Sequence, residues 1–197
     1  MVAVDSNKDK YFAKEIGYIR NEKIKENAII LINKMPDYFF IEAASSTGKY
    51  HPEFSQGIGG LLRHTKAAVR IAKEILDTET FGNFYTQDEK DLIILALIMH
   101  DSVKRGDNER YTRTDHPLLA CKLIDDTKKE LTLSEEQIEL LKSMISSHMG
   151  EWNKDYDGNE ILPKPETKYQ RIVHLCDLLS SKKFLDVIFD KLDNIVY

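Results

Sequence analysis

The chain has 197 residues, of which 42% are hydrophobic, and a formal net charge of −5 with an isoelectric point near 5.7. This length and apolar content predict one domain, residues 1–197, with a buried core. The acidic balance excludes a general basic surface for long nucleic acid, so any nucleotide contact has to be local. Two cysteines do not make a disulfide framework, the longest apolar run is too short to cross a bilayer, and the opening "MVAVDSNKDK" is polar. We therefore expect a cytoplasmic protein without membrane contact.

Apolar spacing and helix boundary signals predict helices along the chain and no sustained strand. Residues 1–9 are expected to be frayed, and a helix over 18–35 ends at Met35-Pro36. A loop over 41–60, rich in Gly and Ser, precedes a helix over 61–76. Thr86 and Glu89 predict a capping box for the helix that carries residues 91–101. That helix is apolar nearly all round, so it should lie in the centre of the fold.

The second half continues the helical pattern. Asp115 is expected to cap a helix over 116–129, with Pro117 in its first turn. Ser134 and Gln137 predict another capping box for a helix over 135–148. A long loop over 151–165 precedes a final helix that starts near Thr167 and continues to residue 192. The predicted fold class is all-α.

Histidine and aspartate residues lie on or near the ends of several predicted helices. A lone histidine at a helix end is more often a cap or a surface group than a ligand. Here an adjacent His-Asp pair ends the central helix, and further candidates lie before and after it. Helical bundles build metal sites from ligands that several helices donate, and imidazole with carboxylate suits Mn, Fe, Co, Ni or Zn. The candidates, in chain order, are His64, His100, Asp101, His116, His148 and Asp177.

This ordered set resembles the HD-domain superfamily of metal-dependent phosphohydrolases. The stretches "EAASSTGKYHPEFSQGIGGLLRHT", "SSHMGEW" and "LPKPETKYQRIVHLCDLLSS" are similar to the HD domain of a bacterial 3′-to-5′ exoribonuclease family, over about residues 40–181. Ser102 and Val103 stand where that family has an apolar residue and a glycine. About forty residues that read as helix replace the separate nucleic-acid-binding domain of that family, which argues against processive action on RNA.

The resemblance implies an HD-domain helical bundle with two divalent metal ions in its core. Asp101 would bridge the two ions, and the remaining ligands would be His64, His100 and Asp177 for one ion and His116 and His148 for the other. Such a pair produces a hydroxide that attacks phosphorus and stabilises charge on the attacking and leaving oxygens. The expected substrate is a phosphate ester of a nucleotide, a cyclic nucleotide or a short oligonucleotide.

Basic residues after the HD pair are candidates for substrate binding. Lys104 lies three residues after Asp101, so helical geometry would place both side chains on one face. The Lys104 ammonium would then act in catalysis and bind the phosphate. Arg105, Arg110 and Arg113, with Tyr111, follow in a polar loop and would clamp a phosphate or stack on a base, although a solvated loop fits the pattern equally well.

Other side chains leave two interpretations open. His51 is expected to line the mouth of the pocket and to contact substrate. His174 either orients a metal ligand or is a satisfied core histidine, and Trp152 either covers a base or fills the core. The apolar end "FLDVIFDKLDNIVY" either packs on the core or mediates a homodimer.

Three classes of function fit the same ligands. A metal-dependent phosphohydrolase is the preferred reading, with Asp101 and Lys104 as its catalytic residues. A diiron oxygenase of a related HD branch would use the same four histidines and two aspartates. A non-catalytic nucleotide-binding module is the third, although a site free to decay should have lost one of its six ligands.

Overall fold

The computed structural model describes residues 4–45, 51–106, 111–185 and 187–196. Within these ranges, the regular elements are helices, and the only β pairing is two isolated bridges. The all-α prediction is confirmed. The α-helices are α1 (Ala13–Ile16), α2 (Glu22–Lys34), α3 (Gly60–Asp77), α4 (Glu79–Gly82), α5 (Gln87–Met99), α6 (His116–Thr127), α7 (Glu135–Ser146) and α8 (Lys168–Ser180). The 3-10 turns are η1 (Lys8–Phe12), η2 (Asp37–Phe40), η3 (Glu53–Ser55) and η4 (Lys128–Glu130).

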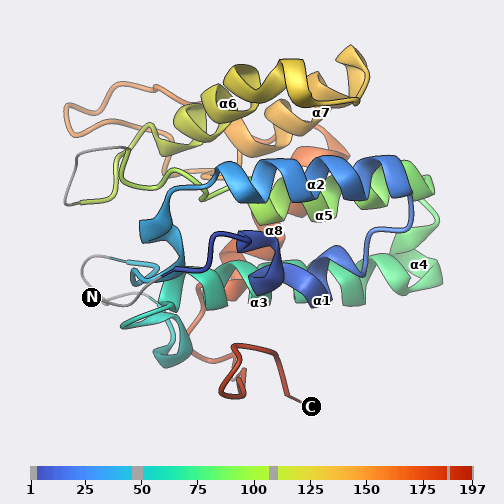
Figure 1. The fold of residues 1–197 in the computed structure, drawn as a ribbon. Helices are drawn as coiled ribbons and strands as arrows, with labels where there is room; N and C mark the ends of the chain where they lie inside the picture. The colour runs from blue at the N-terminus through green and yellow to red at the C-terminus, as the bar shows by residue number, and fades with distance from the viewer. Residues whose placement is uncertain (1–3, 46–50, 107–110, 186, 197) are drawn as a thin grey trace.

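Helix α5 is the centre of the bundle, as its sequence predicts. Every residue from Asp91 to Met99 is buried, because α2, α3, α7 and α8 all pack against this helix. Figure 1 shows α2 lying alongside α5, with α3 on one side of that layer and α6 and α7 on the other. The buried Asp91 carboxylate accepts the backbone N–H groups of Arg20 and Asn21 at 3.0 and 2.7 Å, which satisfies its charge.

Capping boxes fix the start of three long helices. Thr86 with Glu89 opens α5 and Ser134 with Gln137 opens α7, as predicted, and a third box at Thr167 opens α8. In each box the N-cap side chain accepts from the backbone N–H three residues later, and the side chain at that later position accepts from the N-cap backbone N–H. Both N–H groups lack a partner within the helix, so these bonds fix the residue at which the helix begins.

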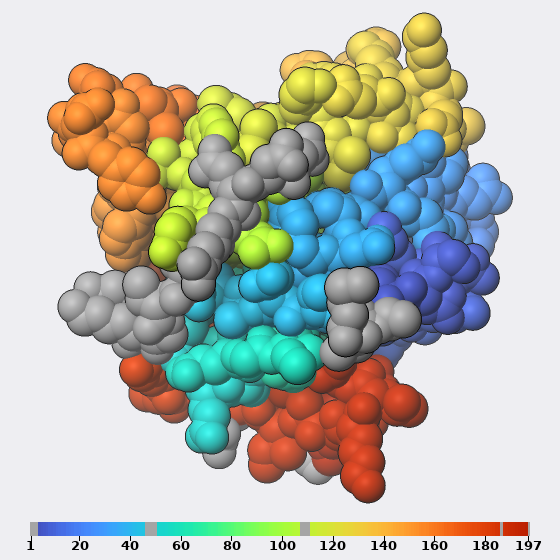
Figure 2. Space-filling model, turned by 60° about the vertical axis from the view of Figure 1, so that its left-hand side comes forward, coloured from blue at the N-terminus to red at the C-terminus, as the bar shows by residue number. Residues whose placement is uncertain are grey.

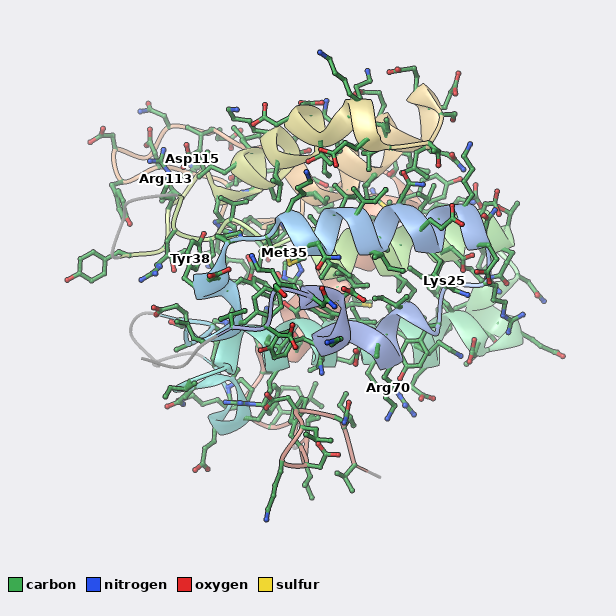
Figure 3. All side chains as sticks on the ribbon, viewed as in Figure 1. Lys25, Met35, Tyr38, Arg70, Arg113 and Asp115 are labelled. Carbon is green, nitrogen blue, oxygen red and sulfur yellow. The ribbon has the colours of Figure 1, made fainter. Side chains whose placement is uncertain are left out.

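The predicted cap at Asp115 is wrong. Its side chain makes no hydrogen bond to the first turn of α6. The carboxylate instead accepts two hydrogen bonds from the Arg113 guanidinium, at 2.7 and 2.8 Å, and Figure 3 shows the two side chains next to each other. A two-bond, charge-assisted partner competes well against a single capping bond.

Helix α8 ends at Ser180, so the predicted continuation to residue 192 is wrong. The Ser180 and Ser181 hydroxyls donate to the carbonyls of Asp177 and Leu178, at 2.8 and 2.7 Å. Serine side chains that bond the nearby backbone offer an alternative to continued helix. The apolar residues beyond therefore follow a helical spacing without forming a helix.

Residues 181–196, which we call the tail segment, lie against the start of α3. The Arg63 guanidinium pairs with the Asp193 carboxylate at 2.8 Å, and the rings of Phe54 and Phe189 are 5.3 Å apart. Figure 2 shows this segment (red) next to the residues that lead into α3 (cyan). Several of its large apolar side chains are nevertheless exposed, such as Phe184 and Leu192, each 78% accessible, whereas Phe189 is half-buried. The exposed side chains do not pack on the core, and the homodimer stays a prediction.

The N-terminal segment is attached to the bundle, so fraying of residues 1–9 is wrong for the part that the structure describes. The Lys8 backbone N–H donates to Asn33 at 2.8 Å, and the Lys8 ammonium pairs with Asp37 at 2.7 Å. Phe12 is fully buried. Residues 1–3 lie outside the described residues. Among those that the structure describes, no helix is long and apolar enough to span a bilayer.

Candidate metal centre

The six candidate ligands, which come from five helices or helix ends, converge at one place in the core. We call this set the metal cluster. Five of its members are at most 1% exposed, and the Asp177 side chain is 18% exposed. Three overlapping triads each bring their ligand atoms within 4.8 Å of one another. The triads are His64, His100 and Asp101, then Asp101, His116 and His148, and then His100, His148 and Asp177.

Three of the rings are oriented by their own turns. The Nδ1 atoms of His100, His116 and His148 each lie 2.7 Å from the backbone carbonyl oxygen of the residue three positions earlier. A carbonyl can only accept, so Nδ1 carries the proton and Nε2 of the neutral ring presents a lone pair. His100 and His148 sit at the ends of α5 and α7, where the last carbonyls lack helical partners. The helix ends thereby orient the rings.

His64 reaches the same tautomer through a side chain on α8. The Ser180 hydroxyl donates to the Asp177 carbonyl at 2.8 Å, so its oxygen accepts from His64 Nδ1 at 3.0 Å. The Nε2 atom of His64 is then also free of a proton in the neutral ring. Ser180 was missed in the sequence, although it lies three residues after Asp177 and hence on the same helix face.

The Asp101 carboxylate divides the four histidines into two pairs. Its Oδ2 atom lies 3.7 and 3.4 Å from Nε2 of His64 and His100. Its Oδ1 atom lies 2.9 and 3.7 Å from Nε2 of His116 and His148. Each carboxylate oxygen therefore faces a different pair of imidazole nitrogens.

The Asp177 carboxylate belongs to the first pair. Its Oδ1 atom lies 2.9 Å from Nε2 of His64 and 3.4 Å from Nε2 of His100. The ligands thus form one group of two histidines with two carboxylate oxygens, and a second group of two histidines with the other oxygen of Asp101.

The donor chemistry of the metal cluster fits a cation. His100 Nε2 and Asp101 Oδ1 are buried without a hydrogen-bond partner, and an unpartnered buried polar atom is costly. Burial works against charge on His100, but the neighbouring carboxylates of Asp101 and Asp177 raise its pKa to about 10. Burial beside His100 lowers the pKa of His148 to about 3. Lone pairs of nitrogen and carboxylate oxygen that face each other need a positive centre between them, and a metal ion supplies one.

A cavity of about 530 Å³ opens onto the metal cluster. Polar side chains of the metal cluster, such as Asp101 and His148, line this cavity. Apolar side chains line it as well, among them Met149, Trp152 and Leu178. Met149 and Leu178 were not predicted from the sequence, in which their only signal is proximity to His148 and Asp177.

Lys104 lies at the junction of this cavity with a second one. Its ammonium forms an ion pair with Asp101 Oδ2, which agrees with the predicted shared face. The second cavity, of about 540 Å³, shares Ser45, Lys104 and Thr112 with the first. Arg105 lines this second cavity, and its guanidinium lies 4.5 Å from the ring centroid of Tyr38.

The other predicted substrate contacts are placed as follows. His51 lines the metal cavity as predicted, with its ring 5.3 Å from that of His64 and its buried Nδ1 atom without a partner. Burial lowers the pKa of His51 to about 3, so its ring is neutral. Arg113 points to Asp115, and its contact with a phosphate stays a prediction. Tyr111 lines the second cavity, and Arg110 lies outside the described residues.

His174 holds the backbone of the candidate ligand His148 in place. Its Nδ1 atom donates to the backbone carbonyl of His148 at 2.7 Å. The ring packs on Gly150, where a Cβ atom would lie 2.2 Å from it, and Gly150 has a φ of +59°. Of the two interpretations left open for His174, the structure favours orientation of a ligand segment.

Comparison with known families agrees with this geometry. Residues 61–182 match the family model of the HD domain. The chain belongs to the HD-domain family. The matched range begins in α3, ends just after α8 and includes the entire metal cluster, whereas α1 and α2 precede it. No curated protein and no solved structure shows a significant match to the chain. The finer likeness to an exoribonuclease family therefore rests on the sequence stretches alone.

Proposed function

We propose that this HD domain is a metal-dependent phosphohydrolase with two divalent ions of Mn, Fe, Co, Ni or Zn. His64, His100 and Asp177 would hold one ion, and His116 and His148 the other, with Asp101 as the bridge. The observation that carries the proposal is the division of the Asp101 oxygens between two histidine pairs. When bound, two such ions lower the pKa of water and stabilise charge on the oxygens of a phosphoryl group.

The chain's own residues would bind and orient the phosphate ester. Lys104 forms an ion pair with Asp101 of the metal cluster, and it lies where the two cavities meet. Its ammonium would hold a phosphoryl oxygen and stabilise the charge that develops there. His51 has a free Nδ1 atom in the same cavity and, as a neutral ring, would contact the substrate without adding charge.

The size and form of the cavities support a substrate larger than inorganic phosphate. Two adjoining cavities of about 530 and 540 Å³ have room for groups on both sides of a phosphate bound near Lys104. A nucleotide, a cyclic nucleotide or a short oligonucleotide has such groups. Arg105, stacked on Tyr38, would contact the part that lies in the second cavity.

The test is elemental analysis of anaerobically purified protein, followed by a screen of metals against phosphate esters. We expect about two equivalents of a transition metal per chain, and release of phosphate or nucleoside products from part of a panel that includes short RNA. Metal-loaded protein that is inactive on the entire panel would overturn the proposal. Substrate-dependent oxygen consumption by the iron form would indicate the oxygenase, and nucleotide binding without turnover would indicate the non-catalytic module.

A further inference from the structure

Trp152 lines the metal cavity and does not fill the core. It is 56% exposed, and it belongs to the loop of residues 151–165, which stands out as the orange lobe in Figure 2. Only three residues separate it from His148. Of the two interpretations that the sequence left open, packing in the core is therefore wrong.

The backbone on both sides of Trp152 is held in place. On one side, His174 bonds the carbonyl of His148 at 2.7 Å, and the Trp152 N–H donates to Met149 at 3.1 Å. On the other side, Asn153 is 1% exposed and its side chain donates to the Leu162 carbonyl at 3.0 Å. The indole is thus presented from a fixed backbone, and its position relative to the metal cluster is set by the same turn that carries His148.

The wall around Trp152 has a chemistry that a phosphate alone does not need. Met149 and Leu178 line the cavity with Trp152, in addition to the imidazole and carboxylate groups of the metal cluster. Lys182 also lines the cavity, and its ammonium lies 6.0 Å from the centroid of the indole. A flat aromatic group with an attached phosphate matches this combination of side chains, because the ring would lie on the indole and the phosphate would reach Lys104. Stacking of a base on an aromatic side chain contributes about 1–3 kcal/mol.

We propose that Trp152 is the stacking platform for a purine or pyrimidine base, and that it makes the site selective for phosphate esters that carry a base. The inference rests on the proposed phosphohydrolase function for the placement of the phosphate. It adds the residue that distinguishes a nucleotide from a sugar phosphate.

Trp152 is the only tryptophan of the chain, so its fluorescence reports directly on the site. Metal-loaded protein is titrated with adenosine 5′-monophosphate and with ribose 5-phosphate, which lacks the base. We expect saturable quenching by the nucleotide and at least about tenfold weaker binding of the sugar phosphate. Equal affinities for the two, or no change in emission at saturation measured by calorimetry, would overturn the inference.

Variants extend the test by calorimetry, which needs no tryptophan signal. Trp152→Leu should weaken nucleotide binding by about 5- to 150-fold and leave ribose 5-phosphate binding unchanged. Trp152→Phe retains a ring and should retain most of the affinity. Tyr156→Leu, a control on the same loop at a side chain that is 87% exposed, should change neither affinity. Unaltered nucleotide affinity in Trp152→Leu contradicts the platform.

Turnover separates this inference from the function on which it rests. Hydrolysis with equal kcat/KM for esters with and without a base, in both wild type and Trp152→Leu, would overturn the inference and leave the phosphohydrolase intact. Base-dependent binding without hydrolysis of any ester would overturn the phosphohydrolase function and leave the role of Trp152 in base binding intact. Circular dichroism of each variant checks that the helices are retained.

Discussion

Helix α3 carries two buried polar clusters on opposite sides, and they solve the same electrostatic problem differently. His64 faces the metal cluster. Lys66, two residues on and about 200° around the helix, faces a second group that we call the lysine cluster: Glu15, Arg63, Lys66 and Asp193. Lys66 is 1% and Glu15 is 2% exposed, whereas the side chains of Arg63 and Asp193 are 18% and 32% exposed. The charges of Lys66 and Glu15, like those of the metal cluster, therefore have little water to stabilise them.

The difference lies in where the positive charge comes from. The lysine cluster contains two acids and two bases, and the Lys66 ammonium donates to the carbonyl of Asp193 at 3.0 Å. The metal cluster contains two carboxylates and four imidazoles that turn their Nε2 atoms inward, and Lys104 forms an ion pair with one of the carboxylates. A cluster that brings its own cations is charge-balanced after folding, although Glu15 Oε2 is buried without a hydrogen-bond partner. A cluster built mainly from acceptors needs an added cation.

The largest expected effect comes from removing the bridge of the metal cluster. Asp101→Asn should weaken binding of both metal ions and lower hydrolysis by about 10³-fold or more, because an NH₂ group that cannot ligate a cation replaces one of the two bridging oxygens and the negative charge of the bridge is lost. The measurement is metal content together with kcat/KM. Asp91→Asn is the matched control, since it replaces a buried carboxylate at the other end of the same helix and should retain the metal. Equal metal loss in both variants would break the comparison.

Removing the internal cation of the lysine cluster should affect stability and not metal content. Lys66→Met leaves Glu15 buried without its neighbouring ammonium, and we expect a loss of about 3 kcal/mol in the free energy of unfolding. The double variant Glu15→Gln/Lys66→Met should be more stable than Lys66→Met. Urea unfolding measures both, and a double variant that is less stable than either single variant contradicts the assignment.

The stability lost in Lys66→Met should depend on pH, because the loss comes from the charge on Glu15. Burial raises the pKa of Glu15, so the folded state binds a proton at this carboxyl more tightly than the unfolded state does. The contribution of Glu15 to stability therefore increases as the pH falls through its folded pKa. Lys66→Met should lose less stability at about pH 5 than at about pH 7. A pH-independent loss would show that charge is not its cause.

A smaller effect is expected from the support behind the metal cluster. His174→Ala removes the bond to the His148 carbonyl, and loss of such a support typically lowers metal affinity or activity by about 10- to 100-fold. His174→Asn, whose amide can donate in place of Nδ1, should recover part of the affinity. Leu175→Ala, on the exposed side of α8, is the control. Competition with a metal indicator dye distinguishes these outcomes, and wild-type affinity in His174→Ala would exclude the supporting role.

The smallest effect is expected where the lysine cluster meets the tail segment. Asp193→Asn removes the ion pair with Arg63, whereas asparagine tolerates the positive φ of 59° at this position. Because the pair is partly exposed, we expect a change of at most about 1 kcal/mol in stability, and less at high salt. Calorimetry at two salt concentrations tests this, and a cooperative loss of several kcal/mol would mean that the tail segment is part of the core.

Helix starts and the six residues that converge in the core could be predicted because their signals are local or ordered along the chain. The capping boxes at Thr86 and Ser134 have a fixed residue spacing. The segment between Asp91 and Met99 is apolar nearly all round, which predicts a buried helix. The end of α8 was missed because apolar spacing continues beyond Ser180. Periodicity does not reveal the two serine hydroxyls that bond back to the helix.

Contacts between segments that lie far apart in the chain could not be predicted from the sequence. Nothing in the composition shows that Ser180 orients His64, or that the two oxygens of Asp101 face different histidine pairs. The pairing of Lys66 with the tail segment joins positions more than a hundred residues apart. Such contacts depend on how the helices cross, which a single sequence does not specify.

The hydrogen bonds from Nδ1 to carbonyls three residues earlier have a consequence for how metal enters. Folding alone holds these rings in their ligating pose, so the ion does not have to organise them as it does in a zinc finger. An apoprotein with native helices should therefore exist and be refilled without refolding. In the proposed metal centre, exchange of one divalent ion for another would then depend on the supply of each ion and on its preferred coordination.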